Sequence, residues 1–160
     1  MLSRALPGVG HLQNLHPLVI HFPIAFLMAG AFFYALAWIF RREVLAHVGF
    51  AMLLLGAVSA AVATGTGLYA QDGVMVSRTV RANLLLKHRN LMLVVGGLSW
   101  GLTVWAALAR PFPRRGRILF ALVFLGLLGV LLSGADYGGR LVYDYNAGGN
   151  ACPQPIEFTE

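Results

Sequence analysis

Four stretches of this chain are each long and apolar enough to cross a lipid bilayer. They run over residues 18–40, 44–70, 90–109 and 118–135. A helix needs about 20 mostly apolar residues to span the hydrocarbon core. Because no water is available there to satisfy backbone N–H and C=O groups, such segments fold as helices. The sequence therefore predicts an all-α fold, an integral membrane four-helix bundle.

The charge content agrees with a membrane protein. Only 11% of the 160 residues are charged, against about 25% in soluble domains. A soluble globular enzyme, a disordered tail and a nucleic-acid binder are excluded as first interpretations. The net charge of +6 then points to the lipid bilayer, and not to nucleic acid, as the anionic partner.

The chain has room for one membrane domain and a short tail. We expect the four-span domain over residues 1–146 and an extended tail over 147–160. The two links that follow the first and third spans are short and dense in arginine, with six arginines and one acid. Since positive charge favours the cytoplasmic side, these links are predicted inside and both termini in the periplasm. The predicted location is a bacterial inner membrane, crossed several times.

Histidines are the polar residues that carry chemistry in this sequence. Ionisable groups inside membrane spans are costly and mark functional sites by default. His21 lies about one turn into the first span, and His88 opens the third, so an up-and-down topology places both at the outer end. His16 precedes Pro17, where it can be a helix cap, an alternative ligand or a residue supporting the site. His47 is expected at the inner surface, without a ligand role.

The pattern predicts a haem b site. Such a cofactor needs axial nitrogens from facing helices, an apolar slot and cations for its propionates. His21 and His88 are the predicted axial pair, that is, the metal ligands. The slot is expected to be lined by Phe22, Phe26, Met92 and small residues of the second span such as Gly65 and Gly67. The candidate propionate partners are Arg81, Lys87, Arg89 and Arg140.

Glycine motifs support further predictions about packing. Gly97 and Gly101 form a GxxxG motif, which we expect to pack inside the bundle, with a contact between subunits as the alternative. Gly138 and Gly139 indicate a turn after the fourth span, followed by a short strand or a flap at Leu141–Tyr143.

No paired carboxylates and no nucleophile with an adjacent base are evident, so an enzyme is not the favoured interpretation.

Several sequence motifs together resemble a known family. They are HP-x3-HFPIA at His16–Ala25, Ala63-Thr64-Gly65, His88, and GG-x-LVY at Gly138–Tyr143. The chain resembles the bacterial four-span predicted membrane proteins that are grouped as a domain of unknown function, over residues 12–146. The resemblance implies that the histidines are signature residues. It also implies c-type cytochromes and other redox proteins as companions.

These observations lead to one expected function and two alternatives. The leading expectation is an electron-transfer subunit that binds haem b near the periplasmic face. It would pass electrons between a redox partner, such as a c-type cytochrome or a larger membrane redox complex, and the membrane or its quinone pool. The alternatives are a cofactor-free accessory subunit that anchors a larger complex, and a protein that binds a metal or a quinol.

Overall fold

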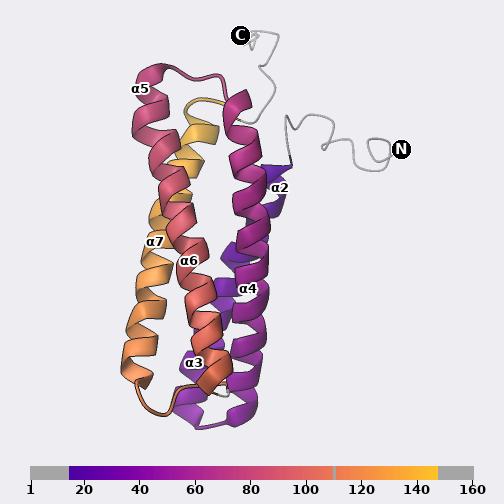
Figure 1. The fold of residues 1–160 in the computed structure, drawn as a ribbon, viewed down its shortest axis with the longest axis vertical. Coiled ribbons are helices and arrows are strands. Elements are labelled where there is room, and N and C mark those ends of the chain that lie inside the picture. The colour runs from indigo at the N-terminus through magenta and orange to yellow at the C-terminus, as the bar shows by residue number, and fades with distance from the viewer. Residues whose placement is uncertain (1–14, 110, 148–160) are drawn as a thin grey trace, which may run out of the picture.

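The computed structural model describes residues 15–109 and 111–147. Throughout these residues the regular structure is helical (Figure 1). In chain order the elements are α2 His16–Val19, α3 His21–Phe40, α4 Glu43–Ala70, η2 Gln71–Gly73, α5 Arg78–Val80, η3 Arg81–Leu85, α6 Leu86–Ala109 and α7 Arg117–Tyr143. The predicted all-α fold is confirmed.

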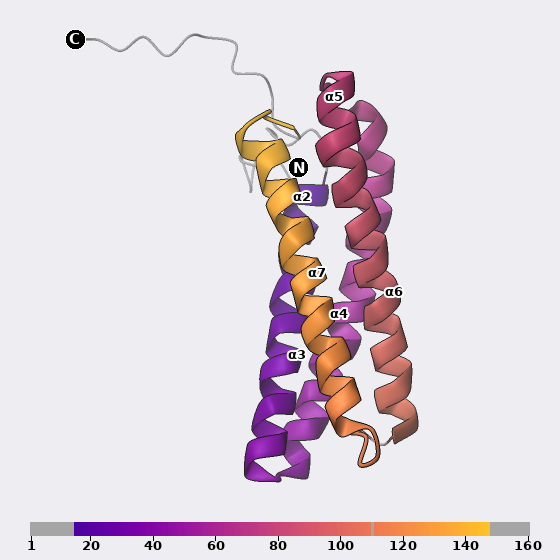
Figure 2. The ribbon, with the colours of Figure 1, turned by 90° about the vertical axis from the view of Figure 1, so that its left-hand side faces the viewer.

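Four continuous helical segments have the length and apolar composition of membrane spans. They are His16–Phe40, Glu43–Gly73, Arg78–Ala109 and Arg117–Tyr143. Figures 1 and 2 show them side by side with nearly parallel axes, joined in up-and-down order. The α3–α4 and α6–α7 links lie at one end, which we call the arginine end. The start of α2, the start of α6 and the last turns of α7 lie at the other, the histidine end.

The first span is interrupted near its start. α2 ends at Val19, Ile20 separates it from α3, and Pro23 is buried in the first turn of α3. Proline has no N–H to donate to the carbonyl four residues earlier, here that of Val19, and its ring crowds that carbonyl. The break therefore falls where Pro23 removes a helical hydrogen bond.

The last helix is longer than the sequence predicts. α7 continues without interruption through Gly138 and Gly139 to Tyr143, so the predicted turn and the strand or flap after it are wrong. The reason is packing: a Cβ added at Gly138 would come within 2.8 Å of Cε1 of His88. Gly138 thus leaves room for the His88 side chain from α6 and does not form a turn.

The most extensive helix contact is between α3 and α4, and it runs through small residues. A Cβ at Gly56 would lie 2.6 Å from Cδ2 of Leu27, and one at Gly49 would lie 3.1 Å from the ring of Tyr34. α4 buries only small residues and Leu53 along this face: Ala46, Gly49, Leu53, Gly56, Ala57, Ala60 and Ala63. Without a hydrophobic driving force between helices in lipid, such close backbone approach supplies the van der Waals contact that holds the pair together.

The glycine motif of α6 faces away from the bundle. Gly97 and Gly101 are exposed, and a Cβ at either would meet nothing within 4 Å. The prediction that this GxxxG packs inside the bundle is therefore wrong. It failed because a GxxxG motif indicates a face that permits close approach but does not identify the helix that approaches.

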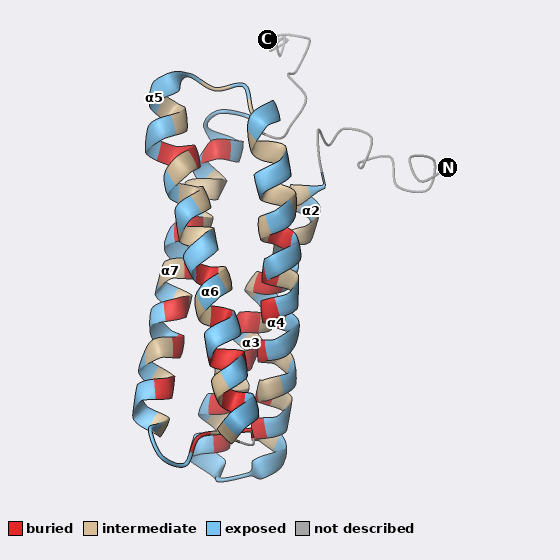
Figure 3. Ribbon diagram, in the orientation of Figure 1, coloured by how far each residue is buried: buried red, intermediate tan, exposed pale blue. Residues whose placement is uncertain are grey.

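Figure 3 shows the buried residues facing inward and the exposed ones along the outer surfaces of the helices.

An aromatic cluster closes the arginine end. The Tyr34 ring lies 5.1 Å from those of Phe112 and Phe120, between centroids. The Tyr34 hydroxyl donates a 3.0 Å hydrogen bond to the carbonyl of Pro111. This bond fastens α3 to the α6–α7 link, so the ends of three helices are joined through one side chain.

Candidate functional site

Two histidine rings meet inside the histidine end of the bundle. His16 begins α2 and His88 lies in the first turn of α6, and both are half-buried. Their ring centroids are 6.2 Å apart and the planes are inclined by 74°. We call these two residues the histidine pair. It joins the first and third spans at the same level.

A hydroxyl on α4 orients the first ring. Nδ1 of His16 lies 3.2 Å from Oγ1 of Thr66, and the Thr66 hydroxyl donates to the carbonyl of Ala63 at 2.9 Å. Because that hydroxyl hydrogen is directed to Ala63, Oγ1 accepts the bond from Nδ1–H of His16. In a neutral imidazole with its proton on Nδ1, Nε2 is the basic nitrogen.

A carbonyl on α7 orients the second ring. Nδ1 of His88 lies 2.7 Å from the carbonyl oxygen of Gly134. A carbonyl only accepts, so His88 also carries its proton on Nδ1 and has Nε2 as its basic nitrogen. Metal-binding histidines are commonly held in this way, with the other ring N–H donated to a carbonyl or carboxylate that fixes the tautomer and the ring orientation.

Glycines leave the space in which both rings pack. A Cβ at Gly67 would lie 2.8 Å from Cε1 of His16, and Gly138 stands in the same relation to His88. Gly67 therefore packs against a ring of the histidine pair. Gly65 does not contact the site, because it is exposed and a Cβ there would meet nothing within 4 Å.

His21 lies apart from the histidine pair. Its side chain is exposed, and within residues 15–109 and 111–147 it makes no hydrogen bond or ring contact. Pro23 contributes to this arrangement, because the helix break at Ile20 separates the short helix that carries His16 from the one that carries His21. The residue that meets His88 is thus the one the sequence suggested as a cap or an alternative ligand. It is not a cap, since α2 begins at His16 itself.

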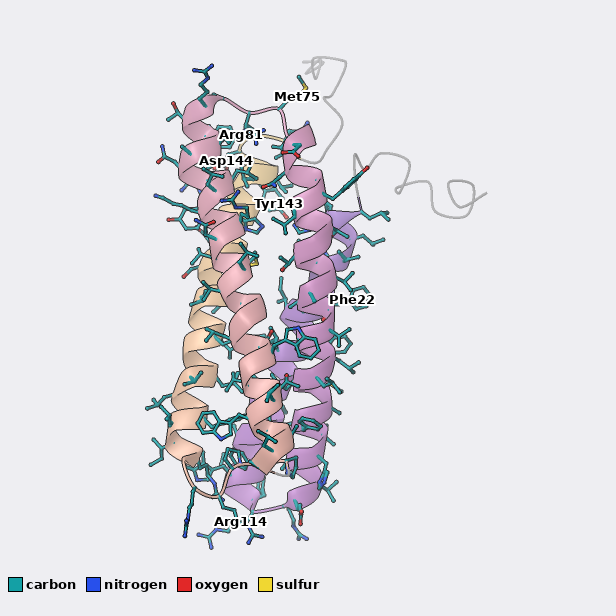
Figure 4. The ribbon with its side chains drawn as sticks, in the orientation of Figure 1. Phe22, Met75, Arg81, Arg114, Tyr143 and Asp144 are labelled. Carbon is teal, nitrogen blue, oxygen red and sulfur yellow. The ribbon has the colours of Figure 1, made fainter. Side chains whose placement is uncertain are left out.

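The predicted slot residues are divided between the interior and the surface. Phe22 is 53% exposed, so its ring faces outward (Figure 4). Phe26 is half-buried, with its ring centroid 6.3 Å from that of Phe22. Met92 packs against the main core, and a Cβ at Gly134 would overlap its terminal methyl carbon.

The candidate propionate partners have separate local roles at the histidine end. Arg81 donates to the carbonyls of Gln71 (3.3 Å) and Val74 (2.9 Å), which fastens the loop between the second and third spans. Arg89 donates to the side-chain oxygen of the adjacent Asn90. Arg140 forms an exposed 3.5 Å ion pair with Asp144. Figure 4 shows Arg81 and Asp144 at the end opposite Arg114.

A polar pocket lies between the start of the third span and the end of α7. It has a volume of about 260 Å³. Its lining comprises Thr79, Val80, Asn83, Leu84, Lys87, Tyr137, Arg140 and Tyr145. The Lys87 ammonium lies 5.9 Å from the Tyr137 ring centroid. Lys87 and Arg140, two of the four cations suggested for the propionates, therefore line the same pocket. Lys87 directly precedes His88 in the chain.

The histidine pair offers two imidazole side chains as potential ligands. Within the described part of the chain no three His, Cys, Asp or Glu side chains come together as a metal site. A closed zinc site needs four protein ligands, and catalytic zinc needs three. A haem needs only two axial ligands, which is what the histidine pair can supply. His47 is elsewhere, exposed and bonded to the carbonyl of Glu43 at 3.0 Å.

Sequence reasoning missed the role of His16 as the partner of His88. The available signal was the placement of small residues at the same level: Thr66-Gly67 near the end of the second span, and Gly134 and Gly138 one turn apart near the end of the fourth. A polar residue beside a glycine at such depth indicates that a large polar side chain packs there. These small residues show where large side chains can pack, but by themselves they do not select His16 over His21.

Comparison with known proteins identifies a family for the chain. No curated protein and no solved structure shows significant similarity to it. One family model, described as "Predicted membrane protein (DUF2231)", matches residues 12–151, which include all four spans and both histidines of the pair. The resemblance noted from the sequence motifs is therefore confirmed. This chain belongs to the predicted membrane protein family DUF2231.

Proposed function

We propose that this protein is a membrane electron-transfer subunit that binds one b-type haem between His16 and His88. It passes electrons between a periplasmic redox partner, such as a c-type cytochrome, and the membrane or its quinone pool. The proposed location is a bacterial inner membrane, with the histidine end toward the periplasm. His16 would hold the haem together with His88, in the place that the sequence suggested for His21.

The observation that carries the proposal is the geometry of the histidine pair. The two ring centroids are 6.2 Å apart. Two imidazoles on one metal, with each nitrogen about 2 Å from it, place their centroids about 6 Å apart. The 6.2 Å between the two centroids is therefore compatible in length with one metal ion held between the rings, and this supports the proposal.

The hydrogen bonds of the two rings support the same interpretation. Thr66 and Gly134 hold the Nδ1 atoms from α4 and α7, so each neutral ring has its basic nitrogen at Nε2. An axial ligand must offer such a nitrogen, and the bond to Nδ1 raises its basicity. Two imidazoles fill both axial positions of a haem iron, which favours electron transfer over oxygen chemistry.

Cationic side chains near the histidine pair could face the propionate groups of the proposed haem. Lys87 lies beside His88 in the chain and lines the polar pocket with Arg140. The ion pair of Arg140 with Asp144 is exposed on both sides, and an exposed pair contributes at most about 1 kcal/mol. Arg140 can therefore leave Asp144 for a propionate group at little cost in free energy. Arg81, in contrast, already donates hydrogen bonds to two loop carbonyls.

Optical spectroscopy of the purified full-length protein tests the proposal. We expect a reduced-minus-oxidised spectrum with the bands of a low-spin b-type haem, lost in His16→Ala and in His88→Ala. His21→Ala is the matched control, because it also removes a histidine near the start of the first span but one that is exposed. A cofactor-replete preparation without visible absorption, or loss of the spectrum in His21→Ala alone, contradicts the proposal.

A cofactor-free anchoring subunit is the second candidate, favoured by the outward face of α6. The exposed Gly97 and Gly101 permit a helix of another chain to approach closely. This role predicts that Gly97→Val releases the protein from a larger complex during gentle detergent extraction. If the wild-type protein carries no chromophore and that variant dissociates, the anchoring function replaces the electron-transfer one.

A further inference from the structure

A second pocket lies at the arginine end, far along the bundle from the histidine pair. Trp38, Arg114, Gly116, Arg117 and Ile118 line it, and its volume is about 410 Å³. The pocket opens between the end of α3 and the start of α7, and we call it the Arg117 pocket. Figure 4 shows Arg114 at this end of the molecule.

Arg117 is held in the pocket by aromatic rings. Its guanidinium carbon lies 5.1 Å from the Phe112 ring centroid and 5.8 Å from that of Trp38. Cations over aromatic faces are attracted by the ring quadrupole, and an arginine stacked in this way keeps its planar fork oriented. Its Nε is buried and has no hydrogen-bond partner within the described residues. A buried N–H without a partner is costly, and no group within the described residues offsets the desolvation of this nitrogen.

Among the described residues, no carboxylate forms an ion pair with an arginine of this end. Within residues 15–109 and 111–147 the one salt bridge is Arg140–Asp144, at the histidine end. Glu43 is the acid that lies near the arginine end, where it occupies the first turn of α4. Arg114 and Arg117 therefore face the pocket without an acidic partner in this part of the chain. An anion from outside the chain would supply the missing charge.

The backbone at the pocket also favours an anion. α7 begins at Arg117 after Gly116, which has a φ of 79° and no side chain that can cap the helix. The first intrahelical bond of this turn is from the N–H of Phe120 to the carbonyl of Gly116. The preceding amides and the positive end of the helix dipole add to the two guanidinium groups, and phosphate groups are the usual ligands of this combination.

The apolar neighbours of the pocket identify the source of the anion. Ile118 lines the pocket and is 66% exposed, and Ile39 and Phe40 at the end of α3 are 69% and 61% exposed. In a membrane span such surfaces lie against acyl chains, with the tryptophan at the headgroup level. We propose that the Arg117 pocket binds the headgroup phosphate of an anionic phospholipid, with its acyl chains along α3 and α7. Basic pockets between membrane helices are known to take such headgroups.

Quenching of tryptophan fluorescence by brominated lipids tests this proposal. The full-length protein is reconstituted into phosphatidylcholine vesicles that contain brominated phosphatidylglycerol or, for comparison, brominated phosphatidylcholine. We expect the wild-type protein to bind the anionic lipid preferentially. Arg114→Gln and Arg117→Gln are each expected to lower this preference about fivefold, the contribution of one basic residue near a charged membrane surface.

Arg115→Gln is the matched control. Arg115 is an exposed neighbour with the same charge that does not line the pocket. Its substitution is expected to leave the preference within twofold of the wild type. An equal loss in all three variants would show diffuse attraction to the charged end, and it would overturn the proposal of a specific pocket.

A competition experiment distinguishes binding of the lipid headgroup from binding of a free phosphate ion. Inorganic phosphate is added to the vesicles that contain phosphatidylglycerol. Persistence of the lipid preference supports a lipid-attached phosphate, because the acyl chains hold it at the site. If inorganic phosphate abolishes the preference, the pocket takes the free ion and the lipid assignment is overturned. Circular dichroism of each variant confirms that its helices are intact.

Discussion

The histidine pair depends on residues that have no chemistry of their own. Gly67 and Gly138 are placed so that the imidazole rings lie where a Cβ would otherwise be. Backbone approach of this kind cannot be read from the identity of a single residue, since Gly65 is two positions away and faces open space. At the residue scale, therefore, the site is defined as much by absent side chains as by present ones.

Substitution of these glycines tests the packing of the pair. Gly67→Ala is expected to push the His16 ring out of place, at a cost of about 1–3 kcal/mol for overpacking. The measurement is the thermal unfolding midpoint in detergent, followed by circular dichroism. Gly65→Ala serves as the control and should be neutral. Equal midpoints for the two variants would show that the His16 ring does not pack against Gly67.

Tyr34 is a polar residue that stabilises the opposite end. Removing its hydroxyl in Tyr34→Phe deletes the bond to the Pro111 carbonyl and keeps the ring stack. We expect a loss of about 1 kcal/mol in unfolding free energy. Chemical denaturation in mixed micelles measures it, with Tyr69→Phe, where the tyrosine is 88% exposed, as the reference. A smaller loss for Tyr34→Phe than for Tyr69→Phe would refute a structural role of the bond.

At the scale of elements, the sequence predicted the spans well and their contacts poorly. The start of α4 and the ends of α3, α4 and α6 lie within one or two residues of prediction, because long apolar runs end at arginines, glycines or polar residues. The third span begins at Arg78, twelve residues before its predicted start at residue 90, and α7 runs eight residues past its predicted end at residue 135, through two glycines. Which face of a helix meets another is a property of the assembled bundle. The GxxxG motif of α6 thus predicts a contact inside the bundle, whereas Gly49 and Gly56 of α4 make the close contact.

The two glycine faces are expected to respond differently to a bulky residue. Gly56→Val places two methyl groups against Leu27, so it should separate α3 from α4 and cost several kcal/mol. Gly97→Val faces open space and should leave the unfolding midpoint within a few degrees of wild type. Thermal unfolding of the two variants side by side measures this. A larger loss for Gly97→Val would mean that α6 packs through its glycines after all.

The whole molecule has two chemically different ends. Arginines and an aromatic cluster lie at one end, and the histidine pair with mixed charges lies at the other. Sequence reasoning placed these residues at the correct ends, because the up-and-down order of four spans leaves no alternative. It could not select His16 over His21 as the partner of His88. That choice depends on the helix break before Pro23 and on the space that α4 and α7 leave for the imidazole rings.

The orientation of the whole molecule remains a prediction that labelling can test. The single cysteine, Cys152, lies in the tail outside the described residues, on the side predicted to be periplasmic. A membrane-impermeant maleimide is expected to label it in intact cells. A Cys152→Ser, Arg115→Cys protein should be labelled only after lysis. The reverse pattern would place the histidine end in the cytoplasm.

The proposed ligands of the haem iron are His16 and His88, and not His21. An exchange of ligand tests this assignment most directly, because replacing one axial histidine by methionine raises the reduction potential of a haem. We predict that a redox titration of the purified full-length His16→Met protein gives a higher midpoint potential than wild type, and that His21→Met leaves it unchanged. A preparation without haem, or a potential that shifts in His21→Met and not in His16→Met, would contradict the account.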